Sequence, residues 1–447
     1  MKKRIFWISI PFLLLIAGIA VFHTLAPIIT GYAAKNLASG IFVAGRTQES
    51  LEKEDLSFFP INLNTNIIDW EKKEVTSRFL FWKSKAIYIE GFGCTLVRDF
   101  SEKEIQSRPY TIVPTLPATS DTIPWPAGDK LSDSIPSTLN AQKLALFLDT
   151  VFADSLPMKG TFAVAIAYKN QLITERYRDD LSADNLFLSW SMAKSITNTL
   201  TGILVSQNKM NLEIPVAIKY WQTDERAEIT LANLLQMNSG LAWNEDYGSN
   251  SDVNRMLFKT GNMSLFAVDK SMKAKPDSTW YYSSGTTNIV CQLIRDAIGN
   301  DTDYYAFPRK ALFNKIGMRN AIFEVDASGT FIGSSYIYAS MRDYVRYGLL
   351  YLNKGNWLGE QIFPEEWIDF TTTTSKGSNG RYGAFFWLNK GSDYPDAPAD
   401  TYLCKGHDGQ FIFIIPSKEL VIVRTGFSQK GVFDVNTFLK GILESLE

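Results

Sequence analysis

The sequence has 447 residues, of which 45% are hydrophobic and 13% aromatic, so it can bury a large core and is not typical of a disordered chain. Its 45 basic and 47 acidic residues give a formal net charge of −2 without long blocks of one sign, which argues against a nucleic-acid partner. The three cysteines, Cys94, Cys291 and Cys404, are too few for a disulfide framework and leave room for one disulfide at most.

The N-terminus begins with Lys2-Lys3-Arg4 and continues with an uncharged stretch over residues 5–22. This stretch is close to the length that spans a bilayer, and the preceding positive charge favours a cytoplasmic N-terminus with the rest translocated. Gly31-Tyr32-Ala33 has the small-x-small spacing of a signal-peptidase site, so a cleaved, secreted form is the alternative. We favour an uncleaved signal anchor over residues 1–35, with the rest of the chain outside the cytoplasm, in the periplasm.

Residues 36–137 differ in character from the rest of the chain and are interpreted as an accessory segment followed by a linker. Residues 101–137 contain six of the seventeen prolines, a density typical of an extended connection. The prolines are Pro109, Pro114, Pro117, Pro124, Pro126 and Pro136. The main domain is therefore expected to begin near residue 138 and to continue to residue 447.

The main domain opens with a predicted helix near 139–152 and a hairpin formed by residues 162–167 and the strand that starts at 172. Helical patterns follow at 191–207, 230–237, 286–298 and 341–352. Strand patterns return at 382–388, 410–415 and 420–425, before a last helix at 432–445. Two early and three late strands predict an α+β fold, in which an antiparallel five-stranded sheet is flanked by helices and a helical subdomain.

The motif Ser191-Met192-Ala193-Lys194 carries the strongest chemical signal, because it follows an apolar approach and opens a long helix. A hydroxyl and an ammonium three residues apart are neighbours on one helix face. If the helix start is buried, the pKa of Lys194 falls, and the amine can take the proton of Ser191 and make it a nucleophile. The same pattern at Ser50–Lys53 reads as solvated surface and at Ser206–Lys209 as a helix end.

Two further motifs accompany the serine. Tyr281-Tyr282-Ser283-Ser284 precedes a helix, where a phenol could face the serine; near a lysine its pKa would fall, although core aromatics are the ordinary reading. The second is Lys405-Gly406-His407-Asp408-Gly409-Gln410, whose glycines permit a close approach of substrate to a strand edge, although a structural histidine is the ordinary reading. A zinc site is disfavoured because a lone histidine cannot supply three ligands.

In this order, the three motifs resemble the serine beta-lactamase and penicillin-binding-protein superfamily, and in particular its class C branch with the 6-aminohexanoate-dimer hydrolases and beta-lactamase-like esterases. The resemblance covers about residues 138–445. It implies that Ser191 forms an acyl-enzyme, that Lys194 and Tyr282 share the role of general base and acid, and that no cofactor is needed. It also implies an oxyanion hole from the N–H groups of Ser191 and Gln410, with His407 and Gly409 in the third motif.

Two departures from the family pattern bear on the substrate. Ser284 replaces a carboxamide, and His407 replaces a permanent cation, so the resemblance favours a small amide or ester over a beta-lactam. Further substrate contacts are expected from Trp243, Tyr247 and Tyr402. The alternatives are a D-alanyl-D-alanine carboxypeptidase or beta-lactamase, and a non-catalytic binder of peptidoglycan peptides. The expected partners are thus a small molecule and, through the N-terminal segment, a membrane, with no nucleic acid or metal.

Overall fold

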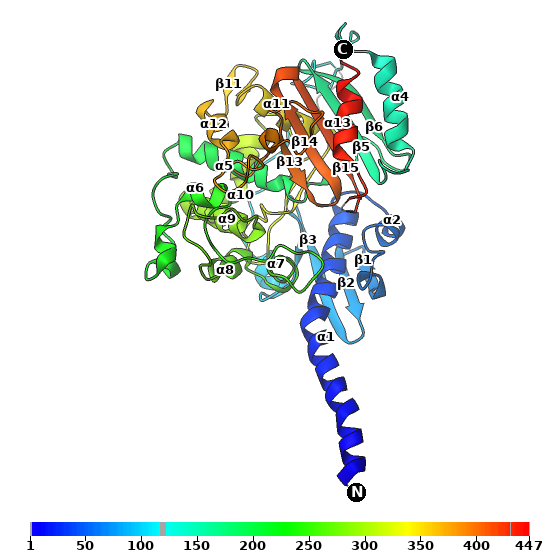
Figure 1. Cartoon of the computed structure of the whole chain (residues 1–447), viewed down its shortest axis with the longest axis vertical. Coiled ribbons are helices and arrows are strands. Elements are labelled where there is room, and N and C mark those ends of the chain that lie inside the picture. Colours follow the sequence, from blue (N-terminus) through cyan, green and yellow to red (C-terminus); the bar gives the residue numbers. More distant parts are fainter. Residues whose placement is uncertain (1, 117–121, 430, 447) are drawn as a thin grey trace.

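The computed structural model describes residues 2–116, 122–429 and 431–446, with side chains described from residue 22 onward (Figure 1). The long N-terminal helix α1 enters at one end of the molecule, and the C-terminus lies at the opposite end beside helix α4 (Figure 1). Between them lie a small N-terminal sheet and a larger sheet covered by helices.

The larger sheet has six antiparallel strands in the order β12-β13-β14-β15-β5-β6. Their bounds are β5 Thr161–Tyr168, β6 Gln171–Tyr177, β12 Trp387–Leu388, β13 Tyr402–Gly406, β14 Gln410–Ile415 and β15 Leu420–Gly426. The predicted five-stranded sheet lacked β13, whose cysteine, lysine and glycine weaken the strand pattern. The predicted strand at 382–388 shrinks to β12, because Phe385 adopts a left-handed φ of 56° and the chain turns there.

Both faces of this sheet are buried, which explains the nearly continuous apolar sequence of its central strands. On β5, Val164 and Ile166 face a core formed with α4 (Ala141–Phe152) and α13 (Val435–Leu443). The alternate residues, Ala163 and Ala165, face the main core beneath α11 (Met341–Leu352). Helix α11 approaches closely at Gly348, where a Cβ atom would lie 2.4 Å from a methyl group of Val421.

The helical part lies on the α11 side of the sheet and comes from the middle of the chain (Figure 1). Its helices are α5 Met192–Ser206, α6 Leu231–Leu235, α7 Asp252–Lys259, α8 Met263–Val268, α9 Ser284–Ile298, α10 Asp301–Pro308 and α12 Glu366–Thr372. Short strands link them: β7 Phe187–Leu188, β8 Ile322–Phe323 and β9 Ile337–Ala339 form one sheet, and β10 Asn356–Trp357 pairs with β11 Glu360–Gln361. The α+β architecture with a helical subdomain is confirmed.

The accessory segment folds against the helical part. Helices α1 (Lys2–Phe42) and α2 (Gln48–Lys53) accompany a four-stranded sheet, formed by β1 Thr65–Asp69, β2 Glu74–Phe79, β3 Trp82–Ile89 and β4 Gly93–Leu96. The second half of α1 is buried from Ala26 to Ile41 against this sheet and against α7. Within it, Lys35 forms an ion pair with Glu324, and both side chains are almost completely buried.

The predicted membrane anchor is wrong. Within the described part of the chain, no helix combines the length and the apolar content that crossing a bilayer requires. Part of residues 1–35 is instead core, because Gly31 and Ala33 lie on the buried face of α1. The apolar run at 5–22 lies almost wholly outside the residues whose side chains are described. Two further predictions depended on this anchor and are corrected with it. They are the membrane partner and the placement of the catalytic domain outside the cytoplasm, in the periplasm.

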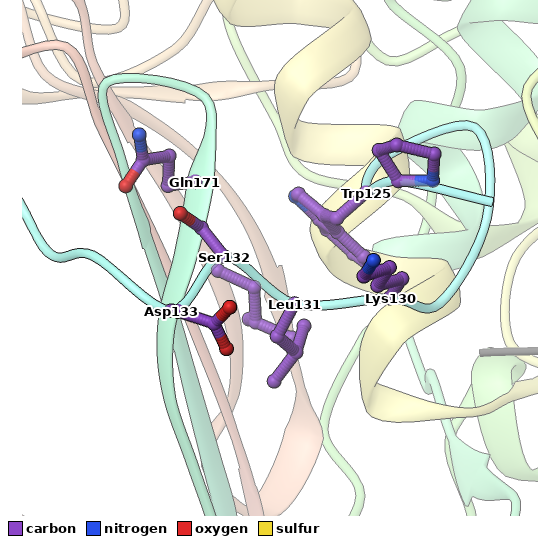
Figure 2. A pocket seen from close by; sticks show the side chains of 8 residues that line it. Trp125, Lys130, Leu131, Ser132, Asp133 and Gln171 are labelled. Carbon is purple, nitrogen blue, oxygen red and sulfur yellow. The ribbon is translucent and has the colours of Figure 1, made fainter. Parts of the chain in front are cut away.

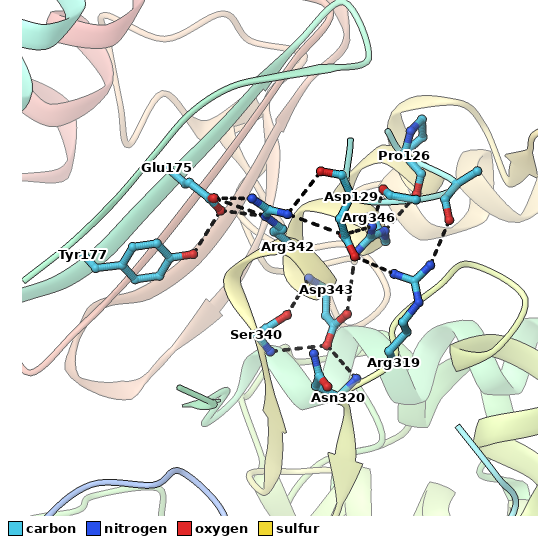
Figure 3. Close-up of polar contacts among 12 residues, drawn as sticks. Pro126, Asp129, Glu175, Tyr177, Arg319, Asn320, Ser340, Arg342, Asp343 and Arg346 are labelled. Atoms are coloured by element: carbon cyan, nitrogen blue, oxygen red, sulfur yellow. Dashed lines mark hydrogen bonds and ion pairs between the residues drawn. The ribbon is translucent and has the colours of Figure 1, made fainter. Parts of the chain in front are cut away.

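The proline-rich linker begins with a short helix, α3 (Glu102–Gln106), and then runs without regular structure, although Pro117 lies outside the described residues. Asp129 connects the linker to α11 and to the segment before β8, because three guanidinium groups surround this carboxylate (Figure 3). They belong to Arg346 at 2.7 Å, Arg319 at 3.3 Å and Arg342 at 3.6 Å. Arg346 also donates to the carbonyl oxygens of Pro126 and Gly128.

A cavity of about 290 Å³ lies between this part of the linker and the start of β6 (Figure 2). Trp125 and Lys130 line it from the linker, and Gln171 lines it from the strand. None of the predicted site residues borders this cavity, so it is separate from the site described below.

Candidate active site

Ser191 lies where β7 gives way to α5, and the turn that presents it is strained. Ser191 is the N-terminal cap residue of α5, and the preceding Trp190 has a left-handed φ of 43°, which is unusual for a bulky side chain. The turn is fixed by Ser189, whose N–H donates to the carbonyl of Ile337 and whose hydroxyl accepts from the Ile337 N–H. The fold therefore holds Ser191 at a fixed helix start.

Lys194 is one turn further along α5 and is buried beneath Ser191. Its ammonium donates to the Oγ atom of Ser191 at 2.9 Å, to the Oγ atom of Ser284 at 3.0 Å and to the carbonyl oxygen of Ser334 at 2.9 Å. The Nζ atom also lies 4.9 Å from the centre of the Tyr282 ring. The structure thus brings the three predicted catalytic side chains, Ser191, Lys194 and Tyr282, together in one place.

The pKa values of the two candidate bases move in opposite directions. Burial lowers the pKa of Lys194 to about 8, although the nearby Glu245 carboxylate and Cys291 oppose the shift. Burial, with the charge of Glu245, raises the pKa of Tyr282, and the hydrogen bond with Ser191 only partly opposes this. The expected fall in the pKa of the phenol is therefore wrong, because desolvation and the Glu245 carboxylate raise it.

Glu245 is a site residue that the sequence analysis missed. Its carboxylate accepts from the Ser284 hydroxyl at 2.5 Å, from the Ser284 backbone N–H at 2.9 Å and from the Trp243 indole N–H at 2.5 Å. Ser284 is the first residue of α9, so the carboxylate also lies at the positive end of that helix. In the sequence, Glu245 stands between two other polar residues and resembles a surface acid.

The third motif forms a tight turn between β13 and β14, beside Trp190. Gly406 touches the chain before Ser191, since a Cβ atom there would lie 2.3 Å from the carbonyl oxygen of Ser189. Gly409 has a φ of 88°, and the Gln410 side chain exchanges two hydrogen bonds with the backbone of Gly426. These contacts fix the turn whose Gln410 N–H is the predicted second donor of the oxyanion hole.

The side chain of His407 lies on an aromatic surface. Its ring stacks on Tyr247 with the ring centres 4.6 Å apart, and the Trp190 ring meets it edge-on at 5.4 Å. These surroundings lower the pKa of His407 below its ordinary value, so the imidazole is neutral at pH 7. Its Nε2 atom lies 3.3 Å from Asp408.

The three aromatic residues expected to contact substrate have different places. Tyr247 lies at the site, against His407. Trp243 is buried, with its ring against Gly285, and its indole N–H donates a hydrogen bond to the Glu245 carboxylate. Tyr402 is in the core under the sheet, where its hydroxyl donates to the carbonyl oxygen of Tyr351. Tyr402 is thus separated from the other site residues, because the β13 strand that carries it faces the main core there.

Two other features of the site bear on its chemistry. The Ser334 carbonyl contacts Lys194 through a main-chain atom, which no sequence motif could reveal. Among the residues that the structure describes, no group of three or more His, Cys, Asp and Glu side chains is arranged to hold a metal ion.

Comparison with known proteins connects this geometry to a family. The profile of the beta-lactamase family matches residues 157–434, which is more than half of the chain and includes all three motifs. Among curated proteins, no relative matches the sequence.

Solved structures share the fold at low sequence identity. A putative 6-aminohexanoate-dimer hydrolase from Bacillus anthracis is 19% identical, with a TM-score of 0.56. The alignment covers 71% of this chain and 86% of the hydrolase chain. A putative beta-lactamase from Bacteroides dorei is 13% identical, with a TM-score of 0.54, and the alignment covers 68% of this chain and 97% of the beta-lactamase chain. A family VIII carboxylesterase is 15% identical, with a TM-score of 0.53, and the alignment covers 69% of this chain and 98% of the carboxylesterase chain. As its motifs indicated, the chain belongs to the beta-lactamase family of serine hydrolases.

Proposed function

We propose that this protein hydrolyses a small, uncharged amide or ester through an acyl-enzyme on Ser191. The observation that carries the proposal is the contact of 2.9 Å between the Ser191 hydroxyl and a buried amine whose pKa is lowered to about 8. Near neutral pH, part of the protein then carries a neutral Lys194, which is the form that accepts a proton. The turn at Trp190 presents the hydroxyl, and the assigned residues follow the family pattern.

In the first half-reaction, neutral Lys194 takes the proton of Ser191 while Oγ forms a bond to the substrate carbonyl carbon. The carbonyl oxygen becomes an oxyanion, for which the backbone N–H groups of Ser191 and Gln410 are the proposed donors. Removing one such donor typically costs about 2.7–4 kcal/mol of transition-state stabilisation. The tight turn around Gly409 supports this role, because it holds the Gln410 backbone in one position.

Collapse of the tetrahedral intermediate breaks the bond to the leaving amine or alcohol, which needs a proton. Tyr282 keeps its proton at neutral pH because its pKa is raised, so it is suited to relay a proton from Lys194 to the leaving group. Water then attacks the acyl carbon on Ser191 and its proton passes to Lys194. The bond between Oγ and the acyl carbon breaks, Lys194 returns the proton to Oγ, and the acid product leaves. We therefore assign Lys194 as the base and Tyr282 as the proton relay.

The charges around the site favour an uncharged substrate. His407 is neutral, and the charged end of Lys405 is directed to the Tyr394 hydroxyl and the Trp387 ring. Arg424 is buried and bound to the Gly409 carbonyl oxygen. No cation near the third motif is thus left to bind the carboxylate of a beta-lactam, among the described residues. The structural similarity to a carboxylesterase and to a putative 6-aminohexanoate-dimer hydrolase supports an ester or an amide as the bond that is cleaved.

The test is active-site labelling with a fluorophosphonate probe, read by intact mass. A single adduct is expected on the wild type and none on Ser191→Ala. Ser206→Ala is the matched control, because Ser206 stands on the same helix with Lys209 three residues later, and it should be labelled like the wild type. An adduct that survives in Ser191→Ala contradicts the assignment of the nucleophile.

Substrate class is tested with p-nitrophenyl acetate, a linear amide and nitrocefin. We expect the ester or the amide to be cleaved and nitrocefin to be spared. Preferred turnover of nitrocefin would favour the beta-lactamase alternative, and absence of fluorophosphonate labelling would favour the non-catalytic binder. We also propose that residues 138–447 carry this activity and that residues 36–137 are accessory to it.

A further inference from the structure

The hydrogen bonds of Lys194 depend on which atoms around it are able to donate. The Ser334 carbonyl oxygen only accepts. A serine hydroxyl has one proton and two lone pairs, and the proton of Ser284 goes to Glu245, whose carboxylate only accepts. Toward Lys194, Ser284 is therefore also an acceptor.

This arrangement has a consequence when Lys194 loses its proton. The ammonium satisfies three acceptors with three protons, namely Ser191, Ser284 and Ser334. The neutral amine keeps two protons and one lone pair. Two of its three partners can only accept, so they take the two protons, and the lone pair is left facing the Ser191 hydroxyl, the one partner that can donate.

We propose that Glu245 is a positioning residue that, through Ser284, turns the lone pair of neutral Lys194 toward Ser191. This inference rests on the proposed function, since it concerns how the base of that reaction is oriented. Ser284 stands where the family pattern has a carboxamide, and in this chain its hydroxyl is held by Glu245. The carboxylate touches neither Ser191 nor the expected position of the substrate carbonyl, so it acts through Ser284.

The position of Glu245 is itself well fixed. Trp243 and the backbone N–H of Ser284 bind its second carboxylate oxygen, which leaves the first oxygen for the Ser284 hydroxyl. Trp243 is buried, and Gly285 gives its ring room, since a Cβ atom at that glycine would lie 2.5 Å from it. A carboxylate held in this way keeps the Ser284 proton on its side.

The experiment measures the rate of fluorophosphonate labelling of Ser191 as a function of pH. In this step Oγ bonds to phosphorus, fluoride leaves and Lys194 takes the proton, so the rate rises with pH as Lys194 becomes neutral. The titratable groups that face Lys194 are Glu245 from its loop, Tyr282 from the segment before α9 and Cys291 from α9. Of these, Glu245 stabilises the protonated form of Lys194 most, because its negative charge raises the pKa of the amine.

Glu245→Gln is expected to change the profile in two ways. Without the carboxylate the ammonium is less stable, so the midpoint moves to lower pH by about one unit. The plateau at high pH falls by about tenfold or more, because an amide no longer offers acceptors to all three donors and the lone pair loses its direction. Ser284→Ala should lower the plateau as well. Asp246→Asn removes the same charge from the next residue of the loop and should leave both features unchanged.

Folding of each variant is checked by its melting temperature. A wild-type midpoint and plateau in folded Glu245→Gln and Ser284→Ala would overturn the positioning role while leaving Ser191 as the nucleophile. Absence of Ser191 labelling in the wild type would instead overturn the proposed function, and the positioning role with it. The two failures are therefore distinguished by the wild-type measurement alone.

Discussion

Lys35 and Glu324 form an ion pair inside the protein, with 1% and 0% of their side chains exposed. The pair joins α1 to the segment that follows β8, nearly three hundred residues later in the sequence. Glu324 also accepts from the Ser39 hydroxyl and from the backbone N–H of Cys94, so its carboxylate has partners on both sides. The contact connects the accessory segment to the hydrolase fold.

Replacing Lys35 with methionine should destabilise the protein strongly, because the Glu324 charge remains buried without its partner. Removing one member of a buried pair typically costs about 3–5 kcal/mol. The measurement is the free energy of unfolding from urea denaturation. Replacing Glu324 with glutamine in the same chain should recover part of the loss, since the unpaired charge is then gone.

The matched control for this prediction is the ion pair between Lys354 and Glu365, which are 65% and 57% exposed. Exposed pairs contribute about 0–1 kcal/mol, so Lys354→Met should leave the unfolding free energy nearly unchanged. Similar losses for Lys35→Met and Lys354→Met would show that burial does not set the strength of the Lys35 contact.

Replacing Asp129 with asparagine should loosen the linker. The carboxylate lies among Arg319, Arg342 and Arg346, and two of these arginines are less than 10% exposed (Figure 3). Loss of the negative charge removes the carboxylate partner of Arg319 and weakens the compensation of Arg346, at an expected cost of about 2–3 kcal/mol, while Arg342 keeps Glu175. Limited proteolysis within residues 108–135 and the unfolding free energy are the measurements. Unchanged proteolysis would contradict the linker's dependence on Asp129.

Lys194→Met should abolish activity and yet stabilise the fold. Burial lowers the pKa of Lys194 from its ordinary 10.5 to about 8, so the folded protein binds this proton less tightly than the unfolded chain does. At pH 7 the variant should gain roughly 1–3 kcal/mol. As pH rises from 8 to 10.5, the wild type becomes more stable with deprotonation and the gain shrinks. A destabilised variant at pH 7 would contradict the burial cost.

Gly406→Ala tests the contact between the third motif and the turn before Ser191. The φ of Gly406 is −113°, which any residue adopts, so only space requires a glycine here. The added methyl group would lie 2.3 Å from the Ser189 carbonyl oxygen and 3.1 Å from Trp190. Displacing the turn should lower kcat/KM by about 10–100-fold. Wild-type activity with a wild-type melting temperature would show that the turn adapts.

The sequence predicted the secondary structure best where regular apolar spacing coincides with turn or capping residues at both ends of an element. The helices near Ser191 and Ser284 and the strands at 410–415 and 420–425 form as predicted, because their apolar spacing is regular and both ends carry turn or cap residues. Ser191, Lys194 and Tyr282 meet because a helix brings residues three apart together, and because α9 packs beside α5.

The features that the sequence did not reveal depend on distant contacts. Glu245 acquires its place only when its loop meets the start of α9. The direction of the Tyr282 pKa shift depends on Glu245 and on burial, so it could not be judged from the nearby lysine. The anchor prediction depended on the apolar stretch at residues 5–22, whereas within the described residues no helix is long and apolar enough to cross a bilayer.

The burial of α1 bears on how this protein can be divided. A fragment beginning at residue 138 would lack Lys35 and would expose the Glu324 carboxylate, together with apolar side chains such as Tyr338 that pack against the N-terminal segment. Excising the hydrolase as a free-standing module should therefore yield an aggregating product. We therefore expect the buried part of α1 to be required for a stable hydrolase fold.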